Sequence, residues 1–197
     1  MKRIFKAFVE YIKANLSSIS KIFINHIGMG IFSLVVLITA KLISSKMSNQ
    51  VVFYIMGALA ILMYFSLIYT AMWERGAADK IKIDGGRMKK SIWHGLWFYL
   101  LGDFIGVISA VLATLLSLFV TSSASFINNV YAVFKFITHY WNSMYLNITE
   151  ISGIHSAIYV ALIIPGALVA FVSYISGVSG QRCIFPEPKY DKNRKIR

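Results

Sequence analysis

One acidic residue, Asp103, lies inside a long apolar stretch of the sequence, residues 91–120. An acid in such a segment is costly in lipid and commonly marks a path for protons or ions. A histidine, His26, lies within another apolar stretch, residues 22–43. A carboxylate and an imidazole that meet inside a membrane can bind a cation or exchange protons. These two residues are therefore the first candidates for ion chemistry.

Other polar side chains reach a similar depth if each apolar stretch forms a helix that rises ~1.5 Å per residue. Asp103 then lies ~9 Å inside the membrane if Trp97 marks the interface, and ~16 Å inside if Ile92 does. His26 lies five residues beyond Lys21, or ~7–8 Å deep. The sequence predicts a polar cavity that opens to the cytoplasm. Its candidate residues for an ion, proton or substrate site are Asp103, His26, Tyr64, Tyr69, Ser173 and Tyr174.

A structural interpretation of Asp103 stands beside the functional one. A single buried acid can hydrogen-bond to a histidine or tyrosine and hold helices in register. A carboxylate close to the interface can also stay hydrated. Replacing Asp103 with asparagine separates these readings, because unchanged activity with unchanged assembly would remove the residue from any mechanism.

The signatures of common enzymes are absent from the sequence. There is no H-E-x-x-H, G-x-S-x-G, P-loop or paired-cysteine metal motif. The four histidines show no ligand-like i, i+4 spacing, and the single cysteine, Cys183, excludes an intrachain disulfide. We therefore expect a protein that is not an enzyme and that holds neither a cofactor nor a metal.

The elements that must position the candidate residues are membrane helices. Hydrophobic residues make up 57% of the 197-residue chain and charged residues only 14%, against about 25% charged residues in an ordinary soluble domain. A helix needs about 20 mostly apolar residues to cross a membrane, and four stretches meet this requirement. We predict an all-α, polytopic integral membrane protein whose transmembrane domain covers residues 22–183. Its spans are residues 22–43, 51–73, 91–120 and 154–180, and Pro165 is expected to kink the last.

Basic residues are concentrated on one side of the predicted spans. Seventeen of the twenty Lys and Arg residues lie before the first span, between the second and third, or after the fourth. Because cytoplasmic segments of membrane proteins are enriched in these residues, both termini are expected in the cytoplasm. The compact loops favour a bacterial plasma membrane. Topology thus explains the net charge of +12, with anionic lipids rather than nucleic acid as the partner of the basic face.

Two further segments have the pattern of amphipathic helices that lie on a membrane surface. Residues 1–21 carry apolar side chains at helical spacing together with several lysines, which suits the anionic inner leaflet. Residues 124–147 have one apolar face, and Tyr131, Tyr140, Trp141 and Tyr145 are expected at headgroup level on the outer side. Residues 184–197 are expected to form a basic cytoplasmic tail.

Small residues recur at every third or fourth position on the third and fourth predicted spans. Such stripes let helix backbones approach closely in lipid. We expect these two helices to pack on each other, with a homo-oligomeric interface as the alternative. The stripes are Gly102, Gly106 and Ala110 on the third span, and Gly166, Ala170, Ser173 and Gly177 on the fourth.

The predicted cytoplasmic loop, residues 74–90, carries most of the charge between the spans. It is expected to anchor anionic lipid, or to dock a cytoplasmic partner, because basic residues next to a span are attracted to the negative membrane surface. The residues in question are Arg75, Lys80, Lys82, Arg87, Lys89 and Lys90.

Two functional classes fit these features. The main prediction is a non-enzymatic subunit or self-associating module of a membrane complex, because only one ionisable residue is placed deep in the membrane. The alternative is a small transporter or channel with Asp103 in the cytoplasm-facing polar cavity. A transporter should act alone in liposomes, whereas a subunit should have a stoichiometric partner.

Overall fold

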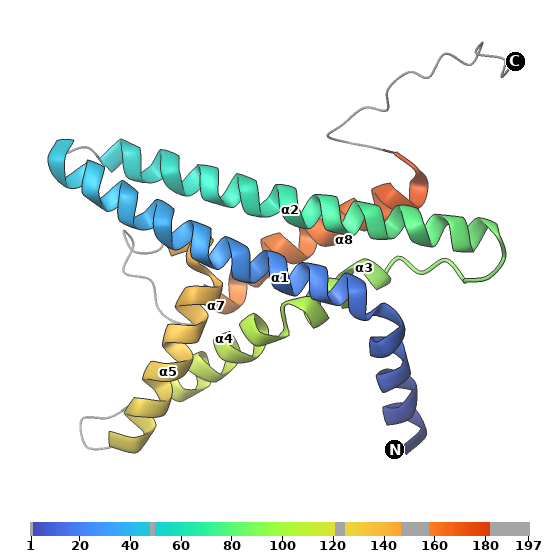
Figure 1. Cartoon of the computed structure of the whole chain (residues 1–197). Coiled ribbons are helices and arrows are strands. Elements are labelled where there is room, and N and C mark those ends of the chain that lie inside the picture. The colour runs from blue at the N-terminus through green and yellow to red at the C-terminus, as the bar shows by residue number, and fades with distance from the viewer. Residues whose placement is uncertain (1, 48–49, 121–124, 147–157, 182–197) are drawn as a thin grey trace, which may run out of the picture.

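The computed structural model describes residues 2–47, 50–120, 125–146 and 158–181, and every regular element in these ranges is a helix (Figure 1). The prediction of an all-α protein is thus confirmed for the described part of the chain. The helices are α1 (Lys2–Met47), α2 (Gln50–Asp84), α3 (His94–Gly102), α4 (Phe104–Ser117), α5 (Ser125–Trp141), the 3₁₀ helix η1 (Ser143–Tyr145), α7 (Ile158–Ala161) and α8 (Ile163–Ser179).

Three helical segments are long and apolar enough to cross a membrane, namely Phe8–Ser45, Val51–Asp84 and Ile158–Ser179. These helices are compatible with a membrane location. The pair α3 and α4 passes the same test together, but the two helices are bent by 69° relative to each other. The third span is therefore not the continuous helix expected over residues 91–120.

The break between α3 and α4 follows from local sequence and from packing. Gly102 and Asp103 are both poor helix formers, so a helix that contains them in succession is easily interrupted. Gly102 also lies directly against α1, where an added Cβ would come within 2.6 Å of the Ile22 side chain. Asp103 adopts φ −97° and ψ 14° and joins the end of α3 to the start of α4.

Helix α2 packs against α1 and against α8, and these three helices form the main body of the molecule (Figure 1). Helices α4 and α5 pack on each other and run away from this body as an arm. The first turns of α1 bend away from the rest of that helix (Figure 1). The arm joins the body at the break between α3 and α4.

Helices α2 and α8 approach each other closely at two glycines. An added Cβ on Gly76 would lie 2.3 Å from the Tyr174 carbonyl oxygen, and one on Gly177 would lie 2.3 Å from that of Trp73. The two backbones therefore touch, and only glycine fits at either position. This contact fixes the position of α8 along α2.

The third and fourth predicted spans pack on each other as expected, since α3 contacts α8, but the glycines of their stripes meet different partners. Gly177 faces α2, while Gly102 faces Ile22 of α1. Gly106 faces Trp141 of α5, and Gly166 faces the hydroxyl groups of Tyr99 and Tyr64. Each glycine makes room for a particular partner, so the two stripes do not pair with each other as one continuous surface. The remaining members, Ala110, Ala170 and Ser173, are buried.

The predicted loop over residues 74–90 is also corrected. Helix α2 continues to Asp84, so only residues 85–93 connect it to α3. Arg75 and Asp79 lie four residues apart on α2 and form an ion pair, and Asp79 is fully buried. Their charges neutralise each other within the helix, so this charged part of the sequence can continue α2 instead of forming a loop.

The boundaries of the two predicted surface helices differ as well. Residues 2–21 belong to the same helix, α1, as the first predicted span. Helix α5 covers Ser125–Trp141, but Trp141 and Tyr145 are buried in the protein instead of lying at headgroup level.

The kink expected at Pro165 is a break between α7 and α8. Pro165 lies in the first turn of α8 and has no backbone N–H to donate to the Ala161 carbonyl, and the helix breaks at Leu162. Residues 147–157 and 182–197, with the predicted tail, lie outside the described residues.

Candidate functional site

Asp103 lies at the centre of the molecule, at the break between α3 and α4. Its backbone amide donates to the Tyr99 carbonyl at 2.8 Å, and its carbonyl accepts from the Val107 amide at 3.0 Å. The backbone is thus satisfied on both sides of the break, as a chain inside a membrane requires. Its side chain is only 4% exposed and points into the protein.

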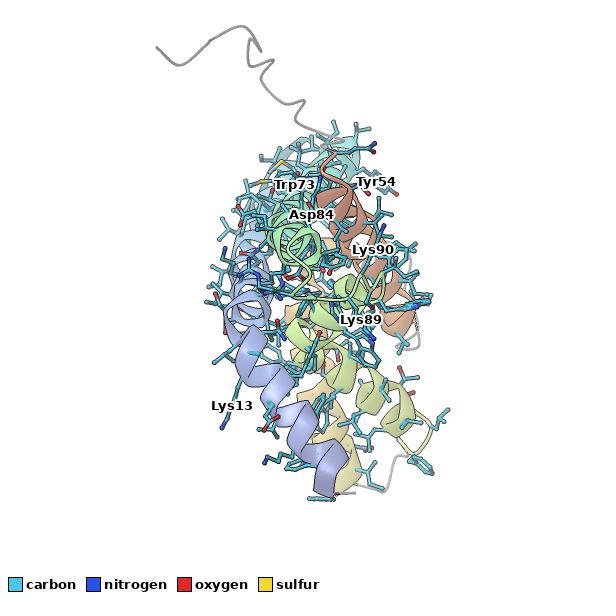
Figure 2. All side chains as sticks on the ribbon, turned by 90° about the vertical axis from the view of Figure 1, so that its right-hand side faces the viewer. Lys13, Tyr54, Trp73, Asp84, Lys89 and Lys90 are labelled. Carbon is cyan, nitrogen blue, oxygen red and sulfur yellow. The ribbon has the colours of Figure 1, made fainter. Side chains whose placement is uncertain are left out.

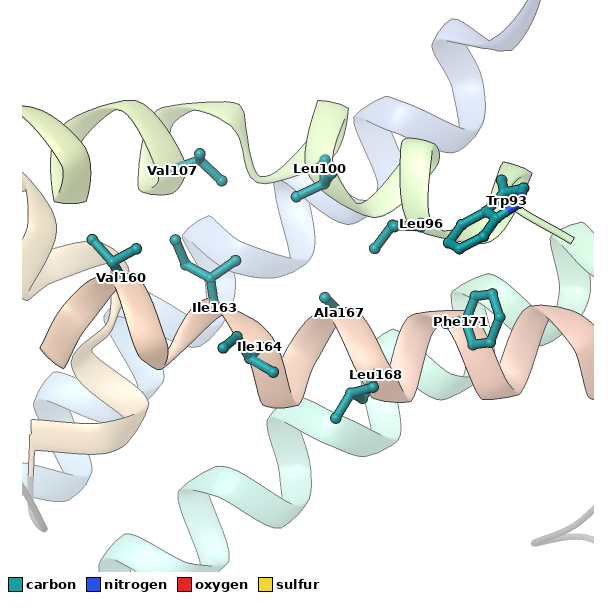
Figure 3. Close-up of a pocket in the computed structure, with 10 residues that line it drawn as sticks. All are labelled: Trp93, Leu96, Leu100, Val107, Val160, Ile163, Ile164, Ala167, Leu168 and Phe171. Carbon is teal, nitrogen blue, oxygen red and sulfur yellow. The ribbon is translucent and has the colours of Figure 1, made fainter.

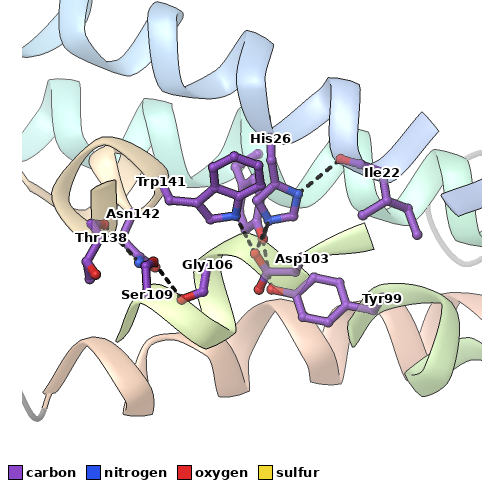
Figure 4. Close-up of polar contacts among 10 residues, drawn as sticks. Ile22, His26, Tyr99, Asp103, Gly106, Ser109, Thr138, Trp141 and Asn142 are labelled. Carbon is purple, nitrogen blue, oxygen red and sulfur yellow. Dashed lines mark hydrogen bonds and ion pairs between the residues drawn. The ribbon is translucent and has the colours of Figure 1, made fainter. Parts of the chain in front are cut away.

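Three side chains contact this carboxyl group (Figure 4), and Tyr64 of α2 joins them through His26. The Trp141 indole N–H of α5 donates to Oδ1, and His26 Nε2 of α1 lies 3.4 Å from the same oxygen. The Tyr99 side chain also hydrogen-bonds to the carboxyl group. We call Asp103, His26, Tyr64, Tyr99 and Trp141 the Asp103 cluster.

His26 is held in one orientation by its own helix. Its Nδ1 lies 3.0 Å from the Ile22 carbonyl oxygen, which can only accept a hydrogen bond. Nδ1 therefore carries a proton, and Nε2 is the nitrogen that can gain or lose one. Nε2 faces both the Asp103 carboxyl group and the Tyr64 hydroxyl, which is 2.8 Å away.

Two tyrosine hydroxyls extend the cluster toward α8. Tyr64 Oη lies 3.0 Å from Tyr99 Oη, so the hydroxyls connect His26 to Tyr99. An added Cβ on Gly166 would lie 2.2 Å from the Tyr99 hydroxyl and 2.9 Å from the Tyr64 hydroxyl. Gly166 thus provides the space that both hydroxyls occupy.

A second buried charged cluster lies nearer to the end of α2. Asp79 Oδ1 lies 3.0 Å from Arg75, and its Oδ2 accepts from the Tyr174 hydroxyl at 3.0 Å. The Arg75 guanidinium also donates to Asn15 Oδ1 at 2.7 Å and to Ser18 Oγ at 3.2 Å. We call Asn15, Ser18, Arg75, Asp79 and Tyr174 the Arg75 cluster. It joins α1 to α2 through the Arg75 guanidinium group, and α8 to α2 through the Asp79 carboxylate.

The two clusters are separated by apolar side chains, as the inner face of α2 shows. Along this face Tyr64 is followed by Ile68 and Met72, and only then by Arg75 and Asp79. Eleven residues separate Tyr64 from Arg75, which corresponds to ~16 Å along the helix. The polar groups of the two clusters are therefore too far apart for direct hydrogen bonds.

The other helices also place apolar residues between the levels of the two clusters. On α1, Ile22 lies between Ser18 and His26, and on α8, Ala170 lies between Gly166 and Tyr174. On α3, Phe98 precedes Tyr99 and stacks under Arg75, whose guanidinium carbon is 4.6 Å from the ring centroid. We call this intervening set the apolar layer. Its members, each at most 2% exposed, are Ile22, Ile68, Met72, Phe98 and Ala170.

The structure brings together three of the six residues predicted for an ion site, namely Asp103, His26 and Tyr64. Tyr174 belongs to the Arg75 cluster instead. The Ser173 hydroxyl donates to the Val169 carbonyl of its own helix at 2.6 Å. Tyr69 lines a groove between α2 and α8 together with Phe65 and Val172, among other residues.

Sequence reasoning missed two members of the Asp103 cluster. Tyr99 lies four residues before Asp103, so helical spacing could have placed both side chains on one face. Trp141 had no such signal, because it reaches the cluster from α5, which lies beyond the connection after α4.

The residues predicted for docking divide into two groups. Arg75 is turned inward, Lys82 Nζ lies 3.6 Å from Asp79, and Lys80 donates to the Ser179 carbonyl at 3.4 Å. The side chains of Arg87, Lys89 and Lys90 are exposed, and their docking or lipid-binding role stays a prediction.

Comparisons of this chain with known proteins found no match. No protein-family model, no curated protein and no solved structure matches this chain. Within the described residues no group of three or more His, Cys, Asp or Glu side chains is placed to hold a metal ion. The geometry of the Asp103 cluster is therefore the basis for a functional argument.

Proposed function

We propose that this protein is a small membrane transporter whose working ion is the proton. The observation that carries the proposal is the buried pair of His26 Nε2 and Asp103 Oδ1, 3.4 Å apart at a broken helix. Both groups exchange protons, and together they can hold one proton at either of two neighbouring atoms. Membrane transporters commonly build ion sites at such helix breaks.

The hydrogen-bonding pattern supports a proton over a larger ion. The Nδ1 proton of His26 is fixed by the Ile22 carbonyl, so only Nε2 changes its protonation. The Trp141 indole can only donate, and it occupies the carboxyl oxygen that also faces His26. A cation would need several oxygen ligands around it, whereas a proton needs only one acceptor.

We further propose a topology in which α1, α2, the bent pair α3–α4 and the pair α7–α8 cross a bacterial plasma membrane. Both termini then lie in the cytoplasm, because Lys and Arg residues are enriched in the N-terminal part of α1, from the end of α2 to the start of α3, and after α8. In this topology the Arg75 cluster lies on the cytoplasmic side of the Asp103 cluster. Reporter fusions at each terminus test it, since both must report a cytoplasmic location.

Proton flux into liposomes tests the transport proposal. The purified protein is reconstituted alone, a pH-sensitive dye is enclosed, and a potassium diffusion potential drives protons inward. We expect flux above that of protein-free vesicles, and its loss in Asp103→Asn. Asp84→Asn is the matched control, because it makes the same chemical change at an exposed position at the end of α2. Equal flux in Asp103→Asn and the unmodified protein would contradict the proposal.

A second candidate function is that of a subunit in a membrane complex, and the arm formed by α4 and α5 favours it. This arm exposes large apolar side chains on its surface, including Ile108, Leu115, Leu118, Phe126 and Phe136. A partner protein or a second copy could cover them. Extraction of the protein from native membranes into nanodiscs, followed by a mass measurement, tests this. A second protein at fixed ratio supports the subunit, and a particle with this chain alone contradicts a hetero-complex.

A further inference from the structure

An apolar groove runs between α8 and the bent pair α3–α4, on a side of the molecule that the ion chemistry does not use (Figure 3). It has a volume of about 530 Å³, and its lining includes Leu100 and Val107 on one side and Ile163 and Ala167 on the other. No charged side chain lines it. Leu100 of α3 and Val107 of α4 both line it, so the groove extends past the break at Asp103.

The groove is open to the surroundings of the protein. Ile164 and Leu168, which line it, are each 57% exposed, and the volume lies within the range of ~300–1,000 Å³ typical of ligand sites. In a protein with membrane-spanning helices such a surface meets acyl chains. Its shape and apolar lining therefore suit one hydrocarbon chain.

One end of the groove changes in chemical character. It closes at the aromatic pair Trp93 and Phe171, whose ring centroids are 5.9 Å apart. One turn further along α8 a smaller cavity follows, lined by Lys90, Ser91 and Tyr174 among others. The apolar surface thus leads directly to a polar, positively charged end.

The connection between α2 and α3 supplies that positive charge. Residues 85–93 contain Arg87, Lys89 and Lys90 and no acidic residue. All three side chains are exposed, and Figure 2 shows Lys89 and Lys90 at the same end of the molecule, with Lys13 on a different part of it. Basic groups beside an apolar groove between helices are typical of sites for anionic lipid headgroups.

We propose that this groove is a binding site for one anionic phospholipid. An acyl chain lies between α8 and the bent pair α3–α4, and the phosphate lies against Lys89 and Lys90 beyond the Trp93–Phe171 pair. Charge complementarity selects the headgroup, and burial of methylene groups in the groove holds the chain. The site is separate from the Asp103 cluster and does not depend on proton transport.

Native mass spectrometry of the full chain tests this site. The protein is released from nanodiscs that contain equal amounts of phosphatidylglycerol and phosphatidylcholine with identical acyl chains. We expect one phosphatidylglycerol to be retained in preference to phosphatidylcholine. The double variant Lys89→Gln/Lys90→Gln should lose this preference by about fivefold for each lysine removed, or about 25-fold in all.

Two controls separate a built site from general attraction between the protein and lipid. Lys6→Gln/Lys13→Gln removes the same charge from exposed positions on α1 and should leave the preference unchanged. Ala167→Phe fills the centre of the groove and should abolish retention of either lipid, whereas Leu115→Phe adds bulk on α4 outside the groove and should not. Helical circular dichroism checks that each variant is folded.

Three outcomes would overturn the proposal. Equal retention of the two lipids by the unmodified protein removes the headgroup preference. An unchanged preference in Lys89→Gln/Lys90→Gln removes the basic end from the site. The third outcome is that the unmodified protein is a dimer with no lipid bound and that Ala167→Phe makes it monomeric. The groove would then be an interface between copies of the chain.

Discussion

At the scale of single residues, the Ile22 carbonyl determines what His26 can do. By fixing the proton on Nδ1 it leaves Nε2 as the only exchanging position, between the Asp103 carboxyl group and the Tyr64 hydroxyl. A proton can therefore move within the Asp103 cluster without rotation of the imidazole. The neighbouring Tyr99 offers a second route to the same carboxyl group.

Tyr64→Phe tests the contribution of the hydroxyl beside His26. It keeps the ring but removes the hydrogen bond of 2.8 Å to Nε2, so the free energy of unfolding should fall by about 1 kcal/mol. Proton flux in liposomes should fall at the same time. Tyr54→Phe is the control, because Tyr54 is 45% exposed, and it should change neither quantity. Full flux in Tyr64→Phe would exclude its hydroxyl from the proton path.

Gly166→Ala tests the packing around the two tyrosine hydroxyls. The new methyl group would lie 2.2 Å from Tyr99 Oη, so Tyr99 or α8 must shift. Overpacking of this kind costs ~1–3 kcal/mol, which thermal unfolding in detergent would detect as a lower midpoint. Gly28→Ala is the control, because nothing lies within 4 Å of a Cβ there. That variant should keep or raise the midpoint, since alanine favours a helix over glycine.

At the scale of helices, the Arg75 cluster fastens the N-terminal part of α1 to α2. Arg75 pairs with Asp79 on its own helix and donates to Asn15 and Ser18 across the contact. These are the two polar side chains through which α1 reaches the guanidinium group. One arginine thus supplies both of these polar contacts to the N-terminal part of α1.

Arg75→Met should loosen this part of α1. It leaves the Asp79 carboxylate buried with a weaker counter-charge, and breaking a buried pair in this way costs ~3–5 kcal/mol. Trypsin should then cleave after Lys13 faster than in the unmodified protein. Lys21→Gln is the control, because the Lys21–Glu74 pair has side chains 60% and 53% exposed and such surface pairs contribute little. An unchanged cleavage rate in Arg75→Met would mean that other contacts hold the segment.

How much of this arrangement the sequence could predict depends on how local each signal is. Long apolar stretches predict the helices, and counting residues from their ends predicts that His26, Tyr64 and Asp103 meet at one depth. The inward turn of Arg75 and Asp79 had a local signal too, since opposite charges at i, i+4 satisfy each other within a helix. It was missed because a charged segment after a span is typical of a loop.

Other features depend on contacts between distant residues. The bend at Asp103 is favoured by Gly102 but is set by Ile22 of α1 and Trp141 of α5, which lie far away in the sequence. The partner of each glycine is likewise fixed by the tertiary arrangement. A small-residue stripe shows that something approaches closely, but it does not show which helix does so.

At the scale of the whole molecule, the apolar layer separates two polar clusters. In the proposed topology it lies between the cytoplasm-facing Arg75 cluster and the Asp103 cluster, where we propose that protons bind. Apolar constrictions exclude water, and protons cannot cross the ~16 Å between the two clusters without water. The apolar layer is thus placed to act as a gate.

Ile68→Ser tests this role. Ile68 is fully buried in the apolar layer, and a hydroxyl there should admit water and raise the passive proton leak into liposomes severalfold. The control is Leu62→Ser, which makes the same kind of change at a side chain 61% exposed on α2. A leak equal in both variants would show that the apolar layer is not the barrier.

The partners of the two buried acids become available at different times during synthesis. Arg75 precedes Asp79 by four residues, so this acid leaves the ribosome directly after its own counter-charge. Asp103 finds His26 already made, but Trp141 follows 38 residues later. At ~5–20 residues per second, Asp103 waits about 2–8 s for the indole. The set of side chains that forms the Asp103 cluster is therefore incomplete until α5 has been translated, although α5 lies outside the helices that hold the acid and the histidine.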